Sequence, residues 1–322
     1  MTTKNLNEPL VSICIPVFNA ERFVAQTLTS LCNQTYKNLE IIVTDDGSTD
    51  RTCEVVEKFD DKRIKLFKQL NLGAGAARNN SFKNSNGDFI KFMDGDDLLN
   101  KTSIAEQIAL STKYPSSIVS SKWGRFYNDD INTFMESPEK VWTDMDGINW
   151  ITISWLDGPN MTQPGIFLLP RNLIEVNGLW IEDLSRGPFD DMEFFTKMIL
   201  AADDVRFSEK STLYYRSGIP GSLSKKKDRI GYEKALKTIK LSVAHLISKT
   251  SNKKSLQAAA TQYKSFLYDA YPEHIDLVKL AEAEIHDLGG SEYKFQAGGY
   301  TAIMVKLLGW KITKRIKYLL KH

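Results

Sequence analysis

The sequence predicts an α/β protein in which helices cover both faces of a mostly parallel sheet. Short apolar or β-branched runs recur at roughly 25–30-residue spacing, and each gap is long enough for a helix, as right-handed parallel crossovers require. The composition, with 42% hydrophobic and 25% charged residues, is that of a soluble folded protein and excludes collagen-like, coiled-coil and disordered chains. A length of 322 residues fits one main domain with appendages.

Five runs are expected to form the strands of this sheet. They are Val11–Phe18, Leu39–Thr44, Arg63–Phe67, Phe89–Met93 and Ile118–Ser120. The helices between them are indicated by apolar residues at helical spacing and by N-cap residues. They are centred on Phe23–Leu31, Cys53–Phe59 and Ile104–Ser111. Open sheets of this kind bind ligands beyond the carboxyl ends of their strands, so the motifs that follow these runs are the candidates for a site.

The strand and helix alternation stops between Arg125 and about Gln163, where polar turn residues dominate. We interpret this stretch as an insertion or lid-like segment. Regular elements are expected to resume afterwards. They are Gly165–Leu169, a helix from about Asp190 to Ala201, a strand from Ser211 to Arg216 and helices between Lys226 and His286. The last group predicts a helical appendage behind the sheet domain.

The cysteine, histidine and charge content limits the kinds of site that the chain can hold. The three cysteines lack metal-ligand spacing and are expected to be reduced, buried thiols. All four histidines lie at or beyond His245, so carboxylates must perform any acid–base chemistry before that point. Residues 293–322 carry seven Lys or Arg and no Asp or Glu; the remaining body is mildly acidic, which argues against nucleic-acid binding. No apolar run has the length of a membrane span and Met1 to Leu10 is polar, which predicts a cytoplasmic chain.

The acidic motif Asp94-Gly95-Asp96-Asp97 ends the fourth apolar run. In an extended chain residues i and i+2 point to one side, so Asp94 and Asp96 can converge on one cation, and Gly95 permits a tight backbone. Hard oxygen ligands suit Mg²⁺ or Mn²⁺, which commonly bridge carboxylates to the phosphates of a substrate. The alternative is an acidic turn in which Asp97 caps the next helix.

Three further motifs follow strand ends. Asp45-Asp46-Gly47-Ser48-Thr49-Asp50 comes after the second run, and alone it could be only a turn and an N-cap. Pro16-Val17-Phe18-Asn19 ends the first run, where the proline frees backbone groups. The third motif, from Asn71 to Asn79, contains Gly73 and Gly75, but Arg78 stands at the third glycine position of a dinucleotide fingerprint. A Rossmann cofactor site is therefore disfavoured.

Taken together and in this order, the four motifs resemble those of the inverting glycosyltransferases of family 2, which have the GT-A fold, a Rossmann-like nucleotide-diphospho-sugar transferase fold. The resemblance covers about Val11 to Ser224. It implies a nucleotide-sugar pocket, usually for UDP, with Asp45 accepting from the base, Asp94 near the ribose and Asp96 on the metal. The remaining residues that it assigns to this pocket are Pro16, Phe18, Asn19, Glu21, Asn71 and Arg78.

Transfer of a sugar to a hydroxyl needs a base on the face opposite the leaving diphosphate, and the chemistry leaves this role to a carboxylate. Asp190-Asp191 opens a predicted helix and resembles the family's Glu-Asp pair, which makes Asp191 the expected base. A helix N-terminus normally favours the ionised carboxylate. The alternative is that both residues only cap the helix. Arg216 and Ser222 resemble a strand and loop that close over the diphosphate, although Arg216 could equally pair with a structural carboxylate.

Four tryptophans flank the expected base. They are Trp142, Trp150, Trp155 and Trp180. Aromatic faces stack on sugar rings, yet large aromatic residues are more often part of the core. Trp180, together with Asp190, is the candidate for contact with the acceptor.

The C-terminal segment predicts an amphipathic helix. Its apolar stripe consists of Leu308, Ile312, Ile316, Leu319 and Leu320, and Lys or Arg residues lie largely off this stripe. The pattern is typical of a helix that lies in the plane of a membrane and is attracted by anionic lipid. The alternative is a helix docked on the body with a solvated basic face.

These observations divide the chain into a GT-A domain (1–225), a helical appendage (226–299) and a basic C-terminal helix (300–322). They predict a metal-dependent glycosyltransferase, with Mn²⁺ or Mg²⁺, that acts on a saccharide or lipid-linked saccharide at the cytoplasmic face of the cell membrane, where the tail contacts the inner-membrane surface. A sugar nucleotidyltransferase is disfavoured because no Gly-rich basic loop follows the first strand. A non-catalytic scaffold that binds nucleotide sugars is the alternative from another class.

Overall fold

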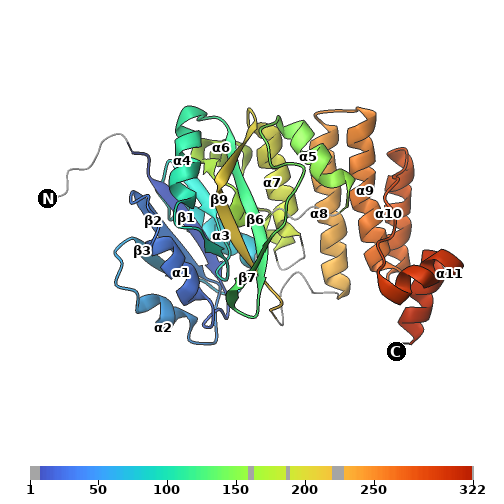
Figure 1. Ribbon diagram of the computed structural model, residues 1–322, viewed down its shortest axis with the longest axis horizontal. Coiled ribbons are helices and arrows are strands. Elements are labelled where there is room, and N and C mark those ends of the chain that lie inside the picture. Colours follow the sequence, from blue (N-terminus) through green and yellow to red (C-terminus); the bar gives the residue numbers. More distant parts are fainter. Residues whose placement is uncertain (1–7, 159–162, 186–188, 220–227, 321–322) are drawn as a thin grey trace.

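The computed structural model describes residues 8–158, 163–185, 189–219 and 228–320. Its central sheet has five strands, and Figure 1 shows it in the N-terminal part of the molecule. In sheet order they are β3 (Ile64–Lys68), β2 (Leu39–Asp45), β1 (Val11–Val17), β4 (Phe89–Phe92) and β8 (Leu169–Pro170). All neighbours are parallel except β8, which runs antiparallel to β4. The mixed α/β class and the mostly parallel sheet are as predicted.

The core of the sheet follows from the apolar runs. Every residue of β2 and β4 is buried, as expected for strands that are covered on both faces. In the parallel register Val11 pairs with both Leu39 and Phe89, so β1, β2 and β4 end at the same edge. The motifs that follow these three strands are therefore neighbours in space.

Helices connect these strands. They are α1 (Val24–Cys32), α2 (Thr52–Glu57), α3 (Ala74–Lys83) and α4 (Ser103–Lys113). The predicted stripe of the first helix is confirmed, because Thr27, Leu28 and Leu31 are buried. The α3 helix packs on β1 and β2. All three cysteines are free thiols, and Cys14 is buried while the other two are partly buried.

A second sheet has the strand order β5 (Leu98–Leu99), β9 (Val205–Ser217), β6 (Ile118–Tyr127) and β7 (Asp130–Glu136). It corrects our interpretation of residues 125–163 as an irregular insertion: this stretch contains the end of β6, the β7 strand and the α5 helix (Gly147–Leu156). The β6 and β7 strands can form a hairpin because the chain makes a tight turn at Asn128 and Asp129. Both residues have left-handed backbone (φ 55° and 59°), which Asn and Asp tolerate in hairpin turns. Because β7 is largely exposed at the sheet edge, its sequence is polar.

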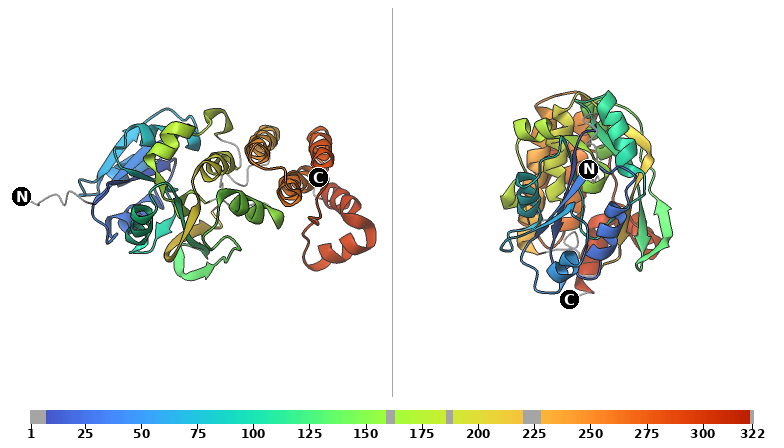
Figure 2. Two further views of the ribbon diagram at one scale, coloured as in Figure 1. Left: turned by 90° about the horizontal axis from the view of Figure 1, so that it is seen from above. Right: turned by 90° about the vertical axis from the view of Figure 1, so that its left-hand side faces the viewer.

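The predicted helix at Asp190 is confirmed as α7 (Asp190–Ala201), which follows the short α6 (Arg171–Asn177). Beyond β9 the described chain is helical, as predicted, with α8 (Arg229–Ile247), α9 (Lys253–Ala270), α10 (Ile275–Asp287) and α11 (Gly299–Leu319). The α8 helix packs on α7, and α9 packs on α5 and α10 (Figures 1 and 2). None of the helices in the described ranges has the length and hydrophobicity of a membrane span.

A lysine lies inside the sheet. Lys91 on β4 is fully buried, and its Nζ donates to Gln107 Oε1 (2.9 Å) and to the carbonyl oxygen of Phe167 (3.3 Å). No carboxylate stands among these partners. Burial lowers the pKa of the Lys91 amine to about 7, because the charged form is desolvated.

We predict that Lys91→Met raises the free energy of unfolding at pH 7 by on the order of 1–2 kcal/mol, since a desolvated amine is replaced by an apolar side chain of similar length. The folded-state pKa lies below the unfolded value, so the penalty from Lys91 is complete below pH 7 and vanishes as the pH rises towards the pKa of a free lysine. The gain should therefore shrink at pH 9.5. Urea unfolding at both pH values measures it, and an equal gain at both would contradict the buried neutral amine.

Candidate functional site

The acidic turn, which we define as Asp94–Asp97, lies beyond the carboxyl end of β4. Gly95 is required there, because a Cβ at this position would stand 2.7 Å from Val17 Cγ1 and 3.2 Å from the Pro16 carbonyl oxygen. The turn therefore lies against the end of β1. Burial, and then the charge of Asp94, raise the pKa of Asp96 to about 7. Asp97 is buried, and its Oδ1 accepts a hydrogen bond from the Arg216 backbone N–H (2.9 Å).

Arg78 on α3 joins the acidic turn to α7. Its side chain is 5% exposed, and the guanidinium contacts Asp94 Oδ1 (2.7 Å) and Asp190 Oδ2 (3.4 Å). The structure thus brings Asp94 and the predicted Asp190-Asp191 pair to one place, although almost a hundred residues separate them in the sequence. A buried guanidinium between two carboxylates keeps both negative charges close together without direct repulsion.

Asp191, the expected base, differs from our expectation in its ionisation. Burial, and then the neighbouring Asp190, raise the pKa of the Asp191 carboxyl to about 8, and Arg78 only partly opposes this. These effects exceed that of the helix N-terminus, which we expected to favour the charged form. A general base works best when its pKa lies near the working pH, so the raised value suits proton abstraction from a hydroxyl.

The predicted nucleotide residues come from three loops that meet at the same edge. Asn19 Oδ1 accepts from the Thr49 backbone N–H (2.9 Å), and Glu21 Oε2 accepts from the Arg51 backbone N–H (3.0 Å), so the loop after β1 binds the loop after β2. Gly47 lies beside Asn71, whose nitrogen would be 3.0 Å from an added Cβ. Pro16 lies in β1, and Phe18, which follows it, is 49% exposed.

Asp45 at the end of β2 has an unused acceptor. Its Oδ2 accepts from the Ser48 backbone N–H (3.1 Å), whereas its buried Oδ1 has no hydrogen-bond partner among the described residues. An unpaired buried carboxylate oxygen is costly, so it is the feature expected of a group that accepts a hydrogen bond from a ligand.

Two polar residues that we did not select shape the loops around the site. Asp46 accepts hydrogen bonds from the backbone N–H groups of Leu72 and Gly73 (both 2.8 Å) and so closes the loop before α3. Asn79 bonds the backbone of Trp180 through both its Nδ2 and its Oδ1 (both 3.0 Å). Asn79 was visible in the Asn71–Asn79 motif, but its partner lies about a hundred residues away.

The structure corrects the proposed acceptor contact at Trp180. The indole is 4% exposed; one face stacks on Phe194 (4.4 Å between centroids, 7° between planes), and the Arg78 guanidinium covers the ring at 4.4 Å. No ring face is left for a sugar. Trp150 and Trp155 are likewise buried in the core. Large aromatic residues here follow their ordinary preference for the interior.

Arg216 pairs with a structural carboxylate, the alternative that the sequence left open. Its side chain is 1% exposed and contacts Asp129 Oδ1 (2.9 Å). Ser222 lies outside the described residues.

Residues 12–162 match the model of glycosyl transferase family 2. Residues 12–162 therefore belong to this family. A beta-1,3-glucosyltransferase of Escherichia coli, WfgD, named as acting on UDP-Glc and alpha-D-GlcNAc-diphosphoundecaprenol, is 35% identical over 137 residues, which are 42% of this chain and 54% of WfgD. An uncharacterized glycosyltransferase of Haemophilus influenzae is 42% identical over 106 residues, 32% of this chain and 42% of that protein. The chain thus spans about half the length of these curated relatives.

Solved structures share the fold of this chain. The crystal structure of S. aureus TarS 1-349 in complex with UDP-GlcNAc has a TM-score of 0.60 at 20% identity and covers 87% of this chain and 89% of that one. At this identity the likeness concerns the fold, which is of the GT-A type.

The acidic turn supplies only part of the ligand set that a divalent cation needs. The described residues contain no group of three His, Cys, Asp or Glu side chains placed to hold a metal. Asp94 and Asp96 supply two carboxylates, and the raised pKa of Asp96 reflects burial and then the charge of Asp94. Mg²⁺ is commonly held by one or two carboxylates with substrate phosphates and water as further ligands, so these residues fit a metal that arrives with the donor.

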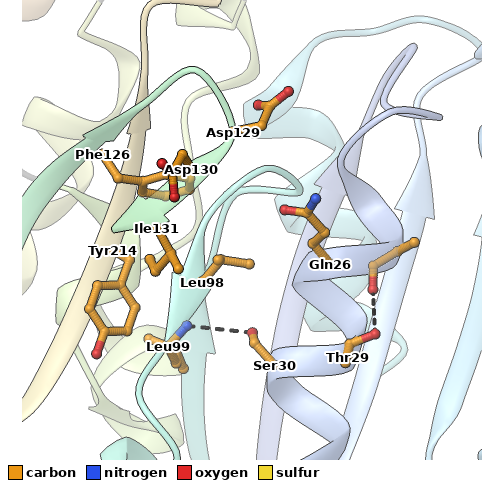
Figure 3. Close-up of a pocket in the computed structure, with 11 residues that line it drawn as sticks. Gln26, Thr29, Ser30, Leu98, Leu99, Phe126, Asp129, Asp130, Ile131 and Tyr214 are labelled. Atoms are coloured by element: carbon orange, nitrogen blue, oxygen red, sulfur yellow. Dashed lines mark hydrogen bonds between the residues drawn. The ribbon is translucent and has the colours of Figure 1, made fainter. Parts of the chain in front are cut away.

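A groove of about 610 Å³ lies away from these residues. Figure 3 shows it between α1, β5 and the turn from β6 to β7. Its lining includes Leu98, Leu99, Phe126 and Ile131 but none of the residues predicted to bind donor, metal or acceptor. It lies behind the acidic turn, because Leu98 and Leu99 directly follow Asp97.

We predict that Trp180→Ala lowers the free energy of unfolding by about 3–5 kcal/mol, since it leaves a cavity beside Phe194 and uncovers Arg78. Val176→Ala on exposed α6 is the control and should change stability by less than about 0.5 kcal/mol. Urea unfolding measures both. Unchanged stability of the Trp180 variant would show that the ring is not part of the core.

Proposed function

We propose that this chain is an inverting glycosyltransferase that moves a sugar from a nucleotide-diphospho-sugar, a UDP-sugar, to an acceptor hydroxyl in polysaccharide or oligosaccharide synthesis. The observation that carries the proposal is the contact of Arg78 with both Asp94 and Asp190, because it unites the acidic turn with the start of the helix that bears Asp191. WfgD is named for UDP-Glc, and TarS was crystallised with UDP-GlcNAc, which supports a UDP-sugar donor.

The donor would lie across the carboxyl ends of β1, β2 and β4. Asp45 has a free acceptor for the base, and the rim is formed by Phe18, Asn19 and Asn71. Asp94 and Asp96 would hold a Mn²⁺ or Mg²⁺ ion, and when bound this ion supplies positive charge for the leaving diphosphate. We assign residues 1–225 to the catalytic domain, 226–299 to the helical appendage and 300–322 to the basic C-terminal helix.

Asp191 would act on the acceptor side. Its carboxylate accepts the proton of the attacking hydroxyl, and the oxygen then attacks the anomeric carbon on the face opposite the diphosphate, which inverts the configuration. Asp190 stays next to Asp191 and is held by Arg78 at 3.4 Å. The negative charge of Asp190 makes the Asp191 carboxylate a stronger base.

A non-catalytic scaffold that binds nucleotide sugars is the second candidate. A binding protein has no need for a buried carboxyl with a pKa of about 8 at the start of α7, and sustaining one costs stability. The raised pKa therefore favours the enzyme.

We also propose that α11 lies on the cytoplasmic face of the cell membrane, where a lipid-linked acceptor would be found. The helix is bent at Gly309 (φ 76°), and Figure 2 shows its two arms. Side chains on both arms are strongly exposed, including Leu307 (76%), Leu319 (74%) and Leu320 (82%). Burial of such side chains in lipid is favourable by about 1.5–3 kcal/mol each, and the five Lys and Arg residues of α11 add positive charge that attracts anionic headgroups.

The opposite face of α11 docks on the body. Trp310 packs against Tyr268 (4.8 Å between centroids) and Tyr271 (5.3 Å), and Lys311 pairs with Glu282 (3.2 Å). These contacts support the docked alternative for one part of α11, and the membrane alternative is our proposal for its exposed side chains. The acceptor part of this proposal is supported by WfgD, whose named substrate is linked to diphosphoundecaprenol.

We predict that Asp191→Asn lowers kcat by about 10²–10⁴-fold, because the amide cannot take the acceptor proton, while UDP still binds with Mn²⁺. In the wild type, kcat/KM should rise with pH towards a plateau above about 8, since the base is protonated below its pKa. A screen of UDP-sugars for transfer or hydrolysis supplies the assay. A chain without turnover for any donor, or an Asp191 variant with full turnover, would refute the proposed base.

We predict that Leu307→Ser combined with Leu319→Ser weakens binding to phosphatidylglycerol-containing vesicles by at least about tenfold, since two apolar side chains no longer enter the interface. The matched control replaces Val176 and Leu280, which are exposed on α6 and α10, by serine and should bind as the wild type does. Vesicle sedimentation at two salt concentrations measures the affinity. Equal binding by both double variants would remove the membrane proposal.

A further inference from the structure

The guanidinium of Arg216 on β9 is held in three directions. Its Nε donates to the backbone carbonyl oxygen of Asp96 (2.8 Å), Nη1 to Asp129 Oδ1 (2.9 Å) and Nη2 to Gln26 Oε1 (2.8 Å). Each nitrogen of the guanidinium thus has a partner on a different segment: the acidic turn, the turn from β6 to β7, and α1. The five donors of this planar group match such a divergent set of acceptors, which a lysine could not.

Aromatic rings cover the same guanidinium. Its central carbon lies 4.6 Å from the centre of the Phe126 ring and 5.0 Å from that of Phe23, and the side chain is only 1% exposed. In this arrangement the Arg216 guanidinium contacts Asp129, Gln26 and the Asp96 carbonyl oxygen rather than the carboxylates of Asp94 or Asp191. Its charge instead lies behind the acidic turn.

Arg216 makes hydrogen bonds to two consecutive residues of the acidic turn. Its side chain binds the carbonyl oxygen of Asp96, and its backbone N–H binds Asp97 Oδ1 (2.9 Å). The Arg216 side chain therefore fixes the Asp96 peptide, and the Arg216 backbone fixes the Asp97 carboxyl. Because side-chain direction depends on the backbone that carries it, these bonds set where the Asp96 carboxylate points.

Asp129, which follows β6 of the second sheet, holds the Arg216 side chain in place. Asp129 lies in the turn after β6, has left-handed backbone (φ 59°) and also contacts Arg22, which precedes α1. Figure 3 shows Asp129 and Gln26 on two sides of the groove behind the acidic turn. The hairpin of β6 and β7 is thereby tied to the acidic turn through a single arginine.

We propose that Arg216 is a positioning residue: it fixes the Asp96 peptide from behind, so that the Asp96 carboxylate faces the divalent cation and the donor diphosphate. This inference rests on the proposed function. It assigns the hairpin turn a role in metal affinity, through Asp129, although no atom of that turn is a metal ligand. Partners that orient metal ligands commonly contribute about 10–100-fold to metal affinity.

The experiment measures Mn²⁺ affinity by calorimetric titration in the presence of saturating UDP, and UDP affinity alone in chelator. Arg216→Lys keeps the charge but loses the divergent bonds, and should weaken Mn²⁺ binding by about tenfold or more. Asp129→Asn removes the anchor without touching the acidic turn, and should weaken it in the same direction by a smaller factor. UDP affinity in chelator should stay unchanged in both variants.

Asp130→Asn is the matched control. Asp130 directly follows Asp129 at the start of β7 and carries the same charge, but it is exposed and its Oδ1 accepts from the backbone N–H and the side-chain amide of Asn132. It should bind Mn²⁺ as the wild type does. Thermal unfolding of all variants shows whether they are folded. If Arg216→Lys does not fold, Asp129→Asn still tests the inference.

Three outcomes would overturn the inference, and they differ in whether the proposed function fails with it. If the wild type binds Mn²⁺ and both Arg216→Lys and Asp129→Asn bind it within twofold of that affinity, only the positioning role is refuted. If the wild type itself does not bind Mn²⁺ with UDP, the metal assignment of the proposed function fails and the inference fails with it. Equal weakening by Asp129→Asn and Asp130→Asn would show a general effect of charge and would also refute the positioning role.

Discussion

The site depends on one buried ion pair network, in which Arg78 is held between Asp94 and Asp190 and covered by the indole of Trp180. A buried guanidinium without partners would cost several kcal/mol, so the acidic turn and the start of α7 must both be in place for the fold to accept it. Conversely, without Arg78 the carboxylates of Asp94, Asp190 and Asp191 would face one another without compensation. The same contact therefore fixes how the acidic turn and the start of α7 lie relative to one another.

Two arginines stabilise the acidic turn through different residues. Arg78 lies on the cleft side and contacts the first carboxylate, Asp94, whereas Arg216 lies on the groove side and binds the peptide of Asp96. Neither compensates Asp96 fully, because burial and the charge of Asp94 still raise its pKa to about 7. The turn thus keeps an unmet need for positive charge on the side where a donor diphosphate and its cation would arrive.

The parts of this arrangement that sequence could predict are those encoded by short local patterns. The strand that leads to Asp94, the helix that begins at Asp190 and the loop containing Asp45 were all identifiable, because apolar runs, caps and glycines act over a few residues. What sequence could not supply were partners across the fold. The sequence suggests an acceptor contact for Trp180, because nothing local shows that Phe194 and Arg78 cover the ring. It does not reveal the hairpin of β6 and β7, because the exposed edge strand is largely polar. The pKa of Asp191 was misjudged for the same reason, since burial is a property of the assembled chain.

A series of helix–helix contacts connects α11 to α7, the helix that carries Asp191. The second arm of α11 is fixed by Trp310 against Tyr268 and Tyr271 at the end of α9, α9 packs on α5 and α8, and α8 packs on α7, whose first turn carries Asp191. The loops that we propose bind the donor, in contrast, follow β1, β2 and β4 at the other end of the molecule, as Figure 1 shows. A surface that holds α11 would therefore hold the half of the protein that supplies the base. An acceptor carried by that surface would approach Asp191 from the helical side, while a water-soluble donor could enter from the sheet side.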